Sequence, residues 1–147
     1  MKRSIERKDG ITVRAARSRD CKAVLDLWAR SGIRSSAPDE AFSVRNRLRR
    51  DRALFLVAEH KSRLVATLIA GWDGWRGTMA RLAVDPAYRR QRIAQRLLAA
   101  AEARLRKLGA RRIGALVFSD NETAARFWRA AGYRPEPNIT RFVKDLK

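Results

Sequence analysis

Cysteine and histidine are nearly absent from this chain of 147 residues, which contains Cys21 and His60 and no other residue of either kind. A single cysteine cannot form an intramolecular disulfide, and this agrees with a reducing, cytoplasmic location. A nucleophilic cysteine usually needs a basic partner, and the one histidine is expected in a turn, so Cys21 is interpreted as a packing residue. Because there is no second histidine, His60 is interpreted as a turn residue, and no metal site is predicted.

Long apolar runs are also missing. No stretch approaches the roughly 18 apolar residues that a membrane span needs, and the first ten residues, MKRSIERKDG, have no apolar segment like that of a signal peptide. We therefore expect no membrane partner. With only 8 Gly and 4 Pro beside 46% hydrophobic residues, the chain is predicted to fold as a globule. Residues 1–10 are expected to form a flexible lead-in, and residues 11–147 a single domain.

Acidic residues are scarce relative to basic ones: 15 Asp and Glu stand against 34 Lys and Arg, which gives a net charge of +19. A charge of this size favours anionic partners without saying which kind. The basic residues recur along the whole chain, so a compositional bias toward arginine would give the same picture. A nucleic-acid surface is the less favoured interpretation, and a solvated basic face that suits an anionic small ligand is the favoured one.

The most informative stretch is a predicted strand, basic loop and helix over residues 82–109. The loop, Arg89–Arg92, lies directly before the predicted helix start, and Gly109 ends the helix. The first N–H groups of a helix lack intrahelical partners and lie at the positive end of its dipole, so this loop is suited to binding a polyanion. The apolar residues of the helix follow a 3.6-residue period: Ile93, Leu97, Leu98, Ala101, Leu105 and Leu108.

Alternation and turn residues predict the elements that precede this stretch. The pair Asp73-Gly74 favours a tight hairpin between the last two of these strands. The second helix has a thin apolar face, so it is expected to lie over the surface as a lid; that face consists of Ala41, Phe42, Val44 and Leu48. The predicted strands cover residues 11–17, 53–59, 64–70 and 75–84, and the predicted helices run from an N-cap at Ser18 to about Arg30 and from about Pro38 to Arg50.

After Gly109 the pattern predicts a strand over residues 111–118 and a helix from about Glu122 to Ala131, with final strands at Tyr133 and residues 139–144. The order strand, helix, strand is typical of a right-handed crossover. We therefore expect Leu82–Val84 and Ile113–Val117 to be parallel neighbours. Ligands of such units bind at the carboxyl ends of the strands.

Several separated segments together resemble one family. LAVDPAYRRQRIAQRLL, residues 82–98, resembles the acetyl-CoA-binding motif of the Gcn5-related N-acetyltransferases (GNAT), and DNETAARFWRAAGY, residues 120–133, resembles the motif that follows it. FLVAEHKSRLVATLIAGWDGWRG is similar to a subgroup of small bacterial members whose substrates are generally unassigned. The resemblance implies an α/β (α+β) GNAT fold: a mixed, mostly antiparallel central sheet with a parallel splayed strand pair and helices on both faces.

The resemblance also implies an activity. An enzyme of this family transfers an acetyl group from acetyl-CoA, its cosubstrate, to a primary amine by direct attack on the thioester. We expect this chain to be a monomer or a homodimer. The acceptor is a small-molecule or protein amine, which the sequence does not identify. Backbone groups of the splayed strand would pair with the pantetheine arm, and the basic loop would hold the pyrophosphate. The residues implied to bind the cofactor are Leu82, Ala83, Val84, Arg89, Arg90, Gln91, Arg92, Ile93, Ala94, Asn121 and Trp128.

Two departures from the family pattern concern this loop and the catalytic acid. Arg90 and Arg92 stand where glycines are frequent, so Arg92 either obstructs the phosphates or contributes its guanidinium as an extra ligand. Trp128 stands where many members carry a tyrosine acid, and an indole N–H is not usefully acidic.

Other residues then become candidates for proton transfer. Tyr133 is the nearest alternative acid along the chain, and Asp73 or Glu40 could act as base through water. The alternative function is a catalytically weak or inactive acetyltransferase-like module that binds a polyanion such as RNA.

Overall fold

The computed structural model describes residues 5–6, 9–34 and 40–146. Contacts divide the chain into two compact units, Met1–Leu116 and Val117–Lys147. Within the expected lead-in, Ile5–Glu6 forms the short strand β1. The bounds of the lead-in and of a single domain stay predictions.

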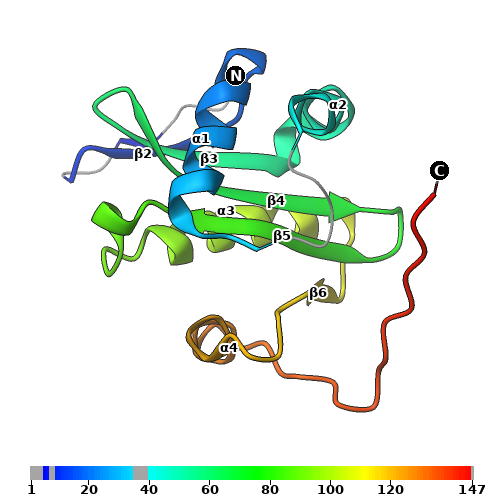
Figure 1. The fold of residues 1–147 in the computed structure, drawn as a ribbon. Helices are drawn as coiled ribbons and strands as arrows, with labels where there is room; N and C mark the ends of the chain where they lie inside the picture. Colours follow the sequence, from blue (N-terminus) through cyan, green and yellow to red (C-terminus); the bar gives the residue numbers. More distant parts are fainter. Residues whose placement is uncertain (1–4, 7–8, 35–39, 147) are drawn as a thin grey trace. The chain divides into compact units, whose positions relative to one another are not determined.

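The first unit is built on a six-stranded sheet in the order β1-β2-β3-β4-β5-β6, drawn in Figure 1. Every neighbouring pair is antiparallel except β5 and β6, which are parallel. The predicted mixed, mostly antiparallel sheet is therefore confirmed. After β1 the strands are β2 (Ile11–Ala15), β3 (Phe55–His60), β4 (Arg63–Trp72), β5 (Gly77–Val84) and β6 (Ile113–Ala115).

Helices cover both faces of this sheet (Figure 1): α1 (Cys21–Ser31) and α2 (Ala41–Asp51) pack on one face, and α3 (Ile93–Leu108) on the other. Because side chains alternate along a strand, β3 and β4 supply apolar residues to both layers. The layer under α1 and α2 contains Ala16, Val24, Leu27, Trp28, Val44, Leu48, Phe55, Val57, Leu64 and Ala83. Short 3₁₀ turns lie at Ser18–Asp20, Arg52–Leu54 and Pro86–Tyr88.

The start of α1 differs from the prediction. Ser18 is not the cap of the helix, because Ser18–Asp20 forms a 3₁₀ turn and the α-helix begins at Cys21. The cause is Asp20, whose carboxylate accepts the N–H of Arg17 at 2.7 Å and the guanidinium of Arg14 at 2.7 and 3.0 Å. Burial raises the pKa of Asp20, but these hydrogen bonds outweigh it and leave the pKa lowered.

α2 packs more firmly than a lid would. Val44 and Leu48 are buried in the same core layer as α1, and Arg47 donates to the carbonyl of Ala70 on β4. The predicted apolar face is wrong for Phe42, which is 65% exposed. Pro38, the predicted first residue of this helix, lies outside the described residues.

The second unit contains α4 (Glu122–Ala130), which begins at Asn121 as expected. The Asn121 side chain accepts the N–H of Ala124 at 3.0 Å and so caps the helix. Residues 131–146 contain no strand, so the predicted final strands at Tyr133 and over residues 139–144 are both wrong. Pro135 and Pro137 have no backbone N–H to donate to a neighbouring strand. The side chains of residues 134–146 are all exposed, so none of them packs a strand against a core.

Candidate functional site

β5 changes direction in the middle. Thr67 of β4 pairs with Ala83 and Ile69 pairs with Ala80, so Leu68 alone faces the two residues Arg81 and Leu82. This is a β-bulge, and the backbone of Arg81 takes a positive φ of 54°. Such a φ is unusual for a residue with a Cβ, so the surrounding structure must hold Arg81 in place.

The bulge determines where the parallel partner strand ends. β6 pairs with Gly77, Thr78 and Met79 and not with Leu82–Val84, so the predicted register is wrong. The physical reason is that pairing stops before Arg81, where β5 bends. Beyond Met79, β5 therefore pairs only with β4. Its opposite edge has no neighbouring strand in the sheet formed by the described residues. Backbone N–H and C=O groups on such an edge are available to an extended ligand.

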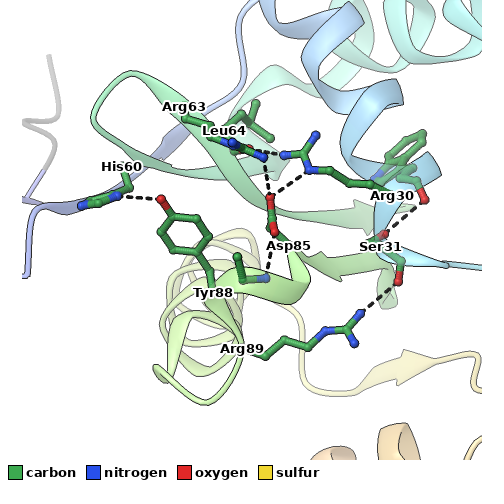
Figure 2. A network of polar contacts seen from close by, with 10 residues as sticks. Arg30, Ser31, His60, Arg63, Leu64, Asp85, Tyr88 and Arg89 are labelled. Carbon is green, nitrogen blue, oxygen red and sulfur yellow. Dashed lines mark hydrogen bonds and ion pairs between the residues drawn. The ribbon is translucent and has the colours of Figure 1, made fainter.

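A buried carboxylate anchors the end of β5. Asp85 is 3% exposed and accepts Nε of Arg30 at 2.8 Å, the N–H of Ala87 at 2.9 Å and Nη2 of Arg63 at 3.2 Å, as Figure 2 shows. Burial raises the pKa of Asp85, but the hydrogen bonds from Ala87 and Arg30 outweigh it, so the pKa lies below its ordinary value. α1, β4 and the turn after β5 are thus joined at one residue.

The basic loop enters α3 through two left-handed residues. Arg90 has φ 62° and Arg92 has φ 58°, so arginines take up the backbone geometry that glycine usually supplies. Arg92 is the N-cap of α3 and makes no side-chain cap hydrogen bond. The side chains of Arg89, Arg90, Gln91 and Arg92 are exposed, while Ile93 is buried and Ala94 half-buried.

The loop is also fixed to α1 by one hydrogen bond. Nη2 of Arg89 donates to the carbonyl of Ser31 at 3.0 Å (Figure 2). The first N–H groups of α3 open into the loop, and its first turn contains no acidic residue. A helix N-terminus that follows a loop with three arginines has a geometry and charge suited to an anion.

Several of these contacts were missed by sequence reasoning. Arg30 and Ser31 of α1 and Arg63 of β4 hold the loop and strand end, yet each looks like an ordinary surface residue in the sequence. Nδ1 of His60 lies 2.8 Å from the hydroxyl of Tyr88, so this histidine contacts the turn before the loop (Figure 2). No local sequence signal marks any of these contacts, because each joins residues far apart in the chain.

Two of the predicted catalytic residues lie in the first unit. Asp73 is exposed in the turn between β4 and β5, where its carboxylate accepts the N–H of Trp75 at 2.8 Å and the N–H of Arg76. The backbone hydrogen bonds from Arg76 and then Trp75 lower its pKa. Glu40 is exposed directly before α2, and its side chain makes no cap hydrogen bond, while its backbone carbonyl accepts the N–H of Val44 at 3.1 Å.

The remaining predicted residues lie in the second unit. The ring of Trp128 packs edge-on against Phe127 and Tyr133, with centroids 5.4 and 4.9 Å apart. Asn121 is occupied as the cap of α4. The roles of Asn121, Trp128 and Tyr133 toward a cofactor stay predictions.

Metal-ligating clusters and membrane-spanning helices are both missing from the described part of the chain. There, no group of three or more His, Cys, Asp or Glu residues is placed to hold a metal ion. Within that same part, no helix has the length and apolar character needed to cross a membrane.

Solved structures of N-acetyltransferases share this fold. The N-acetyltransferase PaiA of Thermoplasma acidophilum, in complex with coenzyme A, has 21% sequence identity and a TM-score of 0.79, over 88% of this chain and 92% of the other. An aminoglycoside 6′-N-acetyltransferase of Acinetobacter haemolyticus shares 20% identity with a TM-score of 0.74, over 92% and 99% of the two chains. The ribosomal-protein-S18-alanine N-acetyltransferase of Escherichia coli shares 21% identity with a TM-score of 0.70, over 83% and 76%. These likenesses establish the fold.

Sequence relatives agree with this fold. An acetyltransferase of Sodalis glossinidius is 30% identical over 134 residues, which are 91% of this chain and 94% of that protein. An acetyltransferase of Pectobacterium atrosepticum is 31% identical over 136 residues, 90% of this chain and 96% of that protein. Residues 16–133 match the family described as "Acetyltransferase (GNAT) family". The predicted family is therefore confirmed, and this chain belongs to the GNAT acetyltransferases.

Proposed function

We propose that this protein transfers an acetyl group from acetyl-CoA to a primary amine. The proposal rests on two features that occur together. One edge of β5 has no neighbouring strand in the described sheet beyond Met79, and a basic loop with two residues in the left-handed conformation leads directly into α3. Family membership supports an acyltransferase, and the local geometry supports the identity of the acetyl donor. Acetyl-CoA supplies the activated acetyl group, and the chain supplies binding, alignment and proton transfer.

The edge of β5 fits the pantetheine arm. Beyond Met79 this edge faces no other strand of the described sheet, so the backbone groups of Leu82, Ala83 and Val84 are available to amide groups of the arm. Ala83 is buried against α1 and the other two are half-buried, so the segment is held firmly from one side. A pre-organised edge of this kind lowers the entropy lost on binding.

The basic loop fits the pyrophosphate. Arg89, Arg90, Gln91 and Arg92 lead to the α3 N-terminus, where Ile93 and Ala94 present N–H groups that have no intrahelical acceptor. The left-handed backbone at Arg92 means that the missing glycine does not prevent the required turn. The exposed guanidinium of Arg92 then acts as an added phosphate ligand rather than an obstruction.

We further propose that the amine attacks the thioester directly. Asn121 and Trp128 would line the cofactor, and Tyr133 is the proposed acid for the leaving thiolate. Glu40 is the better proposed base, because the backbone hydrogen bonds that lower the pKa of Asp73 make that carboxylate a weaker base.

The acceptor is proposed by class. The structurally similar enzymes act on an aminoglycoside antibiotic and on a ribosomal-protein alanine, so the fold serves both small-molecule and protein amines. The net charge of +19 would repel a polycationic acceptor such as an aminoglycoside. We therefore propose that the acceptor amine belongs to a molecule whose net charge is neutral or negative.

Calorimetric titration with acetyl-CoA tests this function, with ATP as a control for binding to positive charge alone. Saturable binding of acetyl-CoA that persists at raised salt, together with a higher unfolding temperature, is the expected result. Lack of binding at millimolar acetyl-CoA would overturn the proposal. In that case, binding of a short RNA with a steep salt dependence would favour the alternative polyanion-binding module.

A further inference from the structure

The bulge at Arg81 switches the face on which β5 presents its side chains. A Cβ added at Gly77 would meet Leu105 of α3 at 3.0 Å, so position 77 faces α3. Ala83 packs in the core layer under α1 and α2 instead. In an unbroken strand, positions 77 and 83 would point to the same face, because their separation is even. The bulge therefore sets the orientation of the segment proposed to bind pantetheine.

A buried hydrogen-bond chain holds this bulge. Nε1 of Trp28 lies 2.9 Å from Oγ1 of Thr67, and that hydroxyl lies 2.9 Å from the carbonyl oxygen of Arg81. An indole N–H can only donate and a carbonyl can only accept, so the single hydroxyl proton must point to Arg81. The direction of the chain is thus fixed as Trp28 to Thr67 to Arg81.

The chain lies in the interior of the first unit. Thr67 is fully buried and Trp28 is 4% exposed. The same indole also contacts the side chain of Arg81, whose guanidinium carbon lies 5.0 Å from the ring centroid. Trp28 stacks on Phe55 with centroids 6.4 Å apart, which fixes the ring. The bulged residue is therefore held both by its carbonyl and by its side chain.

We propose that Thr67 and Trp28 are positioning residues, which fix the Arg81 bulge and so set the backbone of Leu82–Val84 for acetyl-CoA. This inference rests on the proposed function for its consequence in catalysis, whereas its structural part can be measured on the protein alone. Thr67 is the β4 pairing partner of Ala83 through the backbone, and Trp28 packs in the same core layer as Ala83, but the proposal concerns the Thr67 hydroxyl and the Trp28 indole N–H. Both act through the carbonyl of Arg81.

The test uses Thr67→Val, which keeps the shape of the side chain and removes the hydroxyl. The indole N–H and the Arg81 carbonyl are then buried without their partner, which favours opening of the bulge. Amide hydrogen exchange of Leu82–Val84 is expected to become about tenfold faster or more, and the dissociation constant for acetyl-CoA, measured by calorimetry, is expected to rise by about tenfold. Thr67→Ser should restore both values, because it keeps the hydroxyl.

Two further variants complete the design. Trp28→Phe removes the donor and keeps the aromatic stack on Phe55, so it should accelerate exchange less than Thr67→Val does. Thr12→Val on β2 makes the same chemical change away from the bulge, so exchange at residues 82–84 should not change. Unchanged exchange in both Thr67→Val and Trp28→Phe would overturn the inference, and so would a Thr67→Ser variant as impaired as Thr67→Val. If the wild-type protein failed to bind acetyl-CoA, the proposed function would fall, while the exchange data would still decide the positioning role.

Discussion

Arg30 and Asp85 form a charged hydrogen bond of 2.8 Å that joins the last turn of α1 to the residue immediately after β5. The carboxylate is almost fully buried, while the Arg30 side chain keeps 32% of its surface exposed. Arg30 also donates to the carbonyl of Leu64 at 2.9 Å, so one guanidinium connects α1 to both β4 and the end of β5. The strand proposed to hold acetyl-CoA is thus braced at its end as well as at its bulge.

Asp85→Asn is expected to lower the free energy of unfolding by about 2 kcal/mol, because it removes charge-assisted hydrogen bonds from a buried site. Urea unfolding followed by circular dichroism measures this change. Asp26→Asn is the matched control, since Asp26 pairs with Lys22 on the surface at 3.6 Å and should contribute about 0.5 kcal/mol or less. Equal losses in the two variants would contradict the bracing role.

Acid is expected to remove the same stabilisation. The folded-state pKa of Asp85 is lowered, so its contribution is present above the unfolded pKa of about 3.9 and is lost as the pH falls through the folded value. Asp20 shifts in the same direction and adds to this trend. Unfolding free energies of wild type and Asp85→Asn should therefore converge as the pH falls below about 4. A constant difference between the two proteins down to the lowest measurable pH would contradict the lowered pKa.

Gly77→Ala is expected to destabilise the protein by about 1–3 kcal/mol through overpacking. An added Cβ would lie 3.0 Å from Cδ1 of Leu105 and 3.2 Å from Cγ1 of Ile113, so these side chains of α3 and β6 would both have to move by a few tenths of an ångström. Gly114→Ala on β6 is the control, because nothing lies within 4 Å of its added Cβ. That variant should be neutral or slightly more stable. Thermal unfolding of both proteins distinguishes them, and a Gly77→Ala variant as stable as wild type would show that α3 and β6 yield to the added methyl group.

Arg92→Ala is expected to weaken acetyl-CoA binding about tenfold, because it removes a proposed phosphate ligand. Alanine also has a Cβ, so the strain of the left-handed backbone at position 92 stays similar. The change in binding then reports the loss of the guanidinium alone. Arg106→Ala in the last turn of α3 removes an exposed arginine far along the same helix and should leave binding nearly unchanged. Unchanged or tighter binding in Arg92→Ala would instead mean that this side chain obstructs the phosphates.

Tyr133→Phe tests the proposed acid. Loss of a general acid reduces the rate by about a hundredfold or more, and kcat should fall while KM for acetyl-CoA changes little. Tyr88→Phe is the control, since it removes a hydroxyl that contacts His60 at 2.8 Å outside the proposed chemistry. Full activity in Tyr133→Phe would remove this residue from the mechanism.

The sequence pattern predicts the regular parts of the first unit well. α3 begins at Ile93 and ends before Gly109 as its 3.6-residue period requires, and β3 to β5 follow the predicted order. These elements are predictable because their periodicity matches their burial. One exception is Leu108, which ends the predicted apolar stripe but is 49% exposed where α3 passes the edge of the core.

The irregular features could not be predicted. Position 81 carries neither glycine nor proline to mark a bulge, and the backbone of Arg81 is held by contacts from α1 and β4. Thr67 lies in the run LVATLIA, where a threonine resembles any β-branched strand residue. Its role depends on Trp28, 39 residues earlier in the chain. Tertiary contacts of this kind leave no periodic signal in the sequence.

The left-handed arginines at positions 90 and 92 have a consequence for how such loops change over time. Glycine and arginine codons differ by a single base, so one mutation exchanges a flexible residue for a charged one in the same turn. The exchange carries a backbone strain of about 1–3 kcal/mol per position and adds a positive charge beside the proposed phosphate site. In this loop, arginine side chains therefore add electrostatic attraction for an anion while the chain keeps the path that glycine would allow.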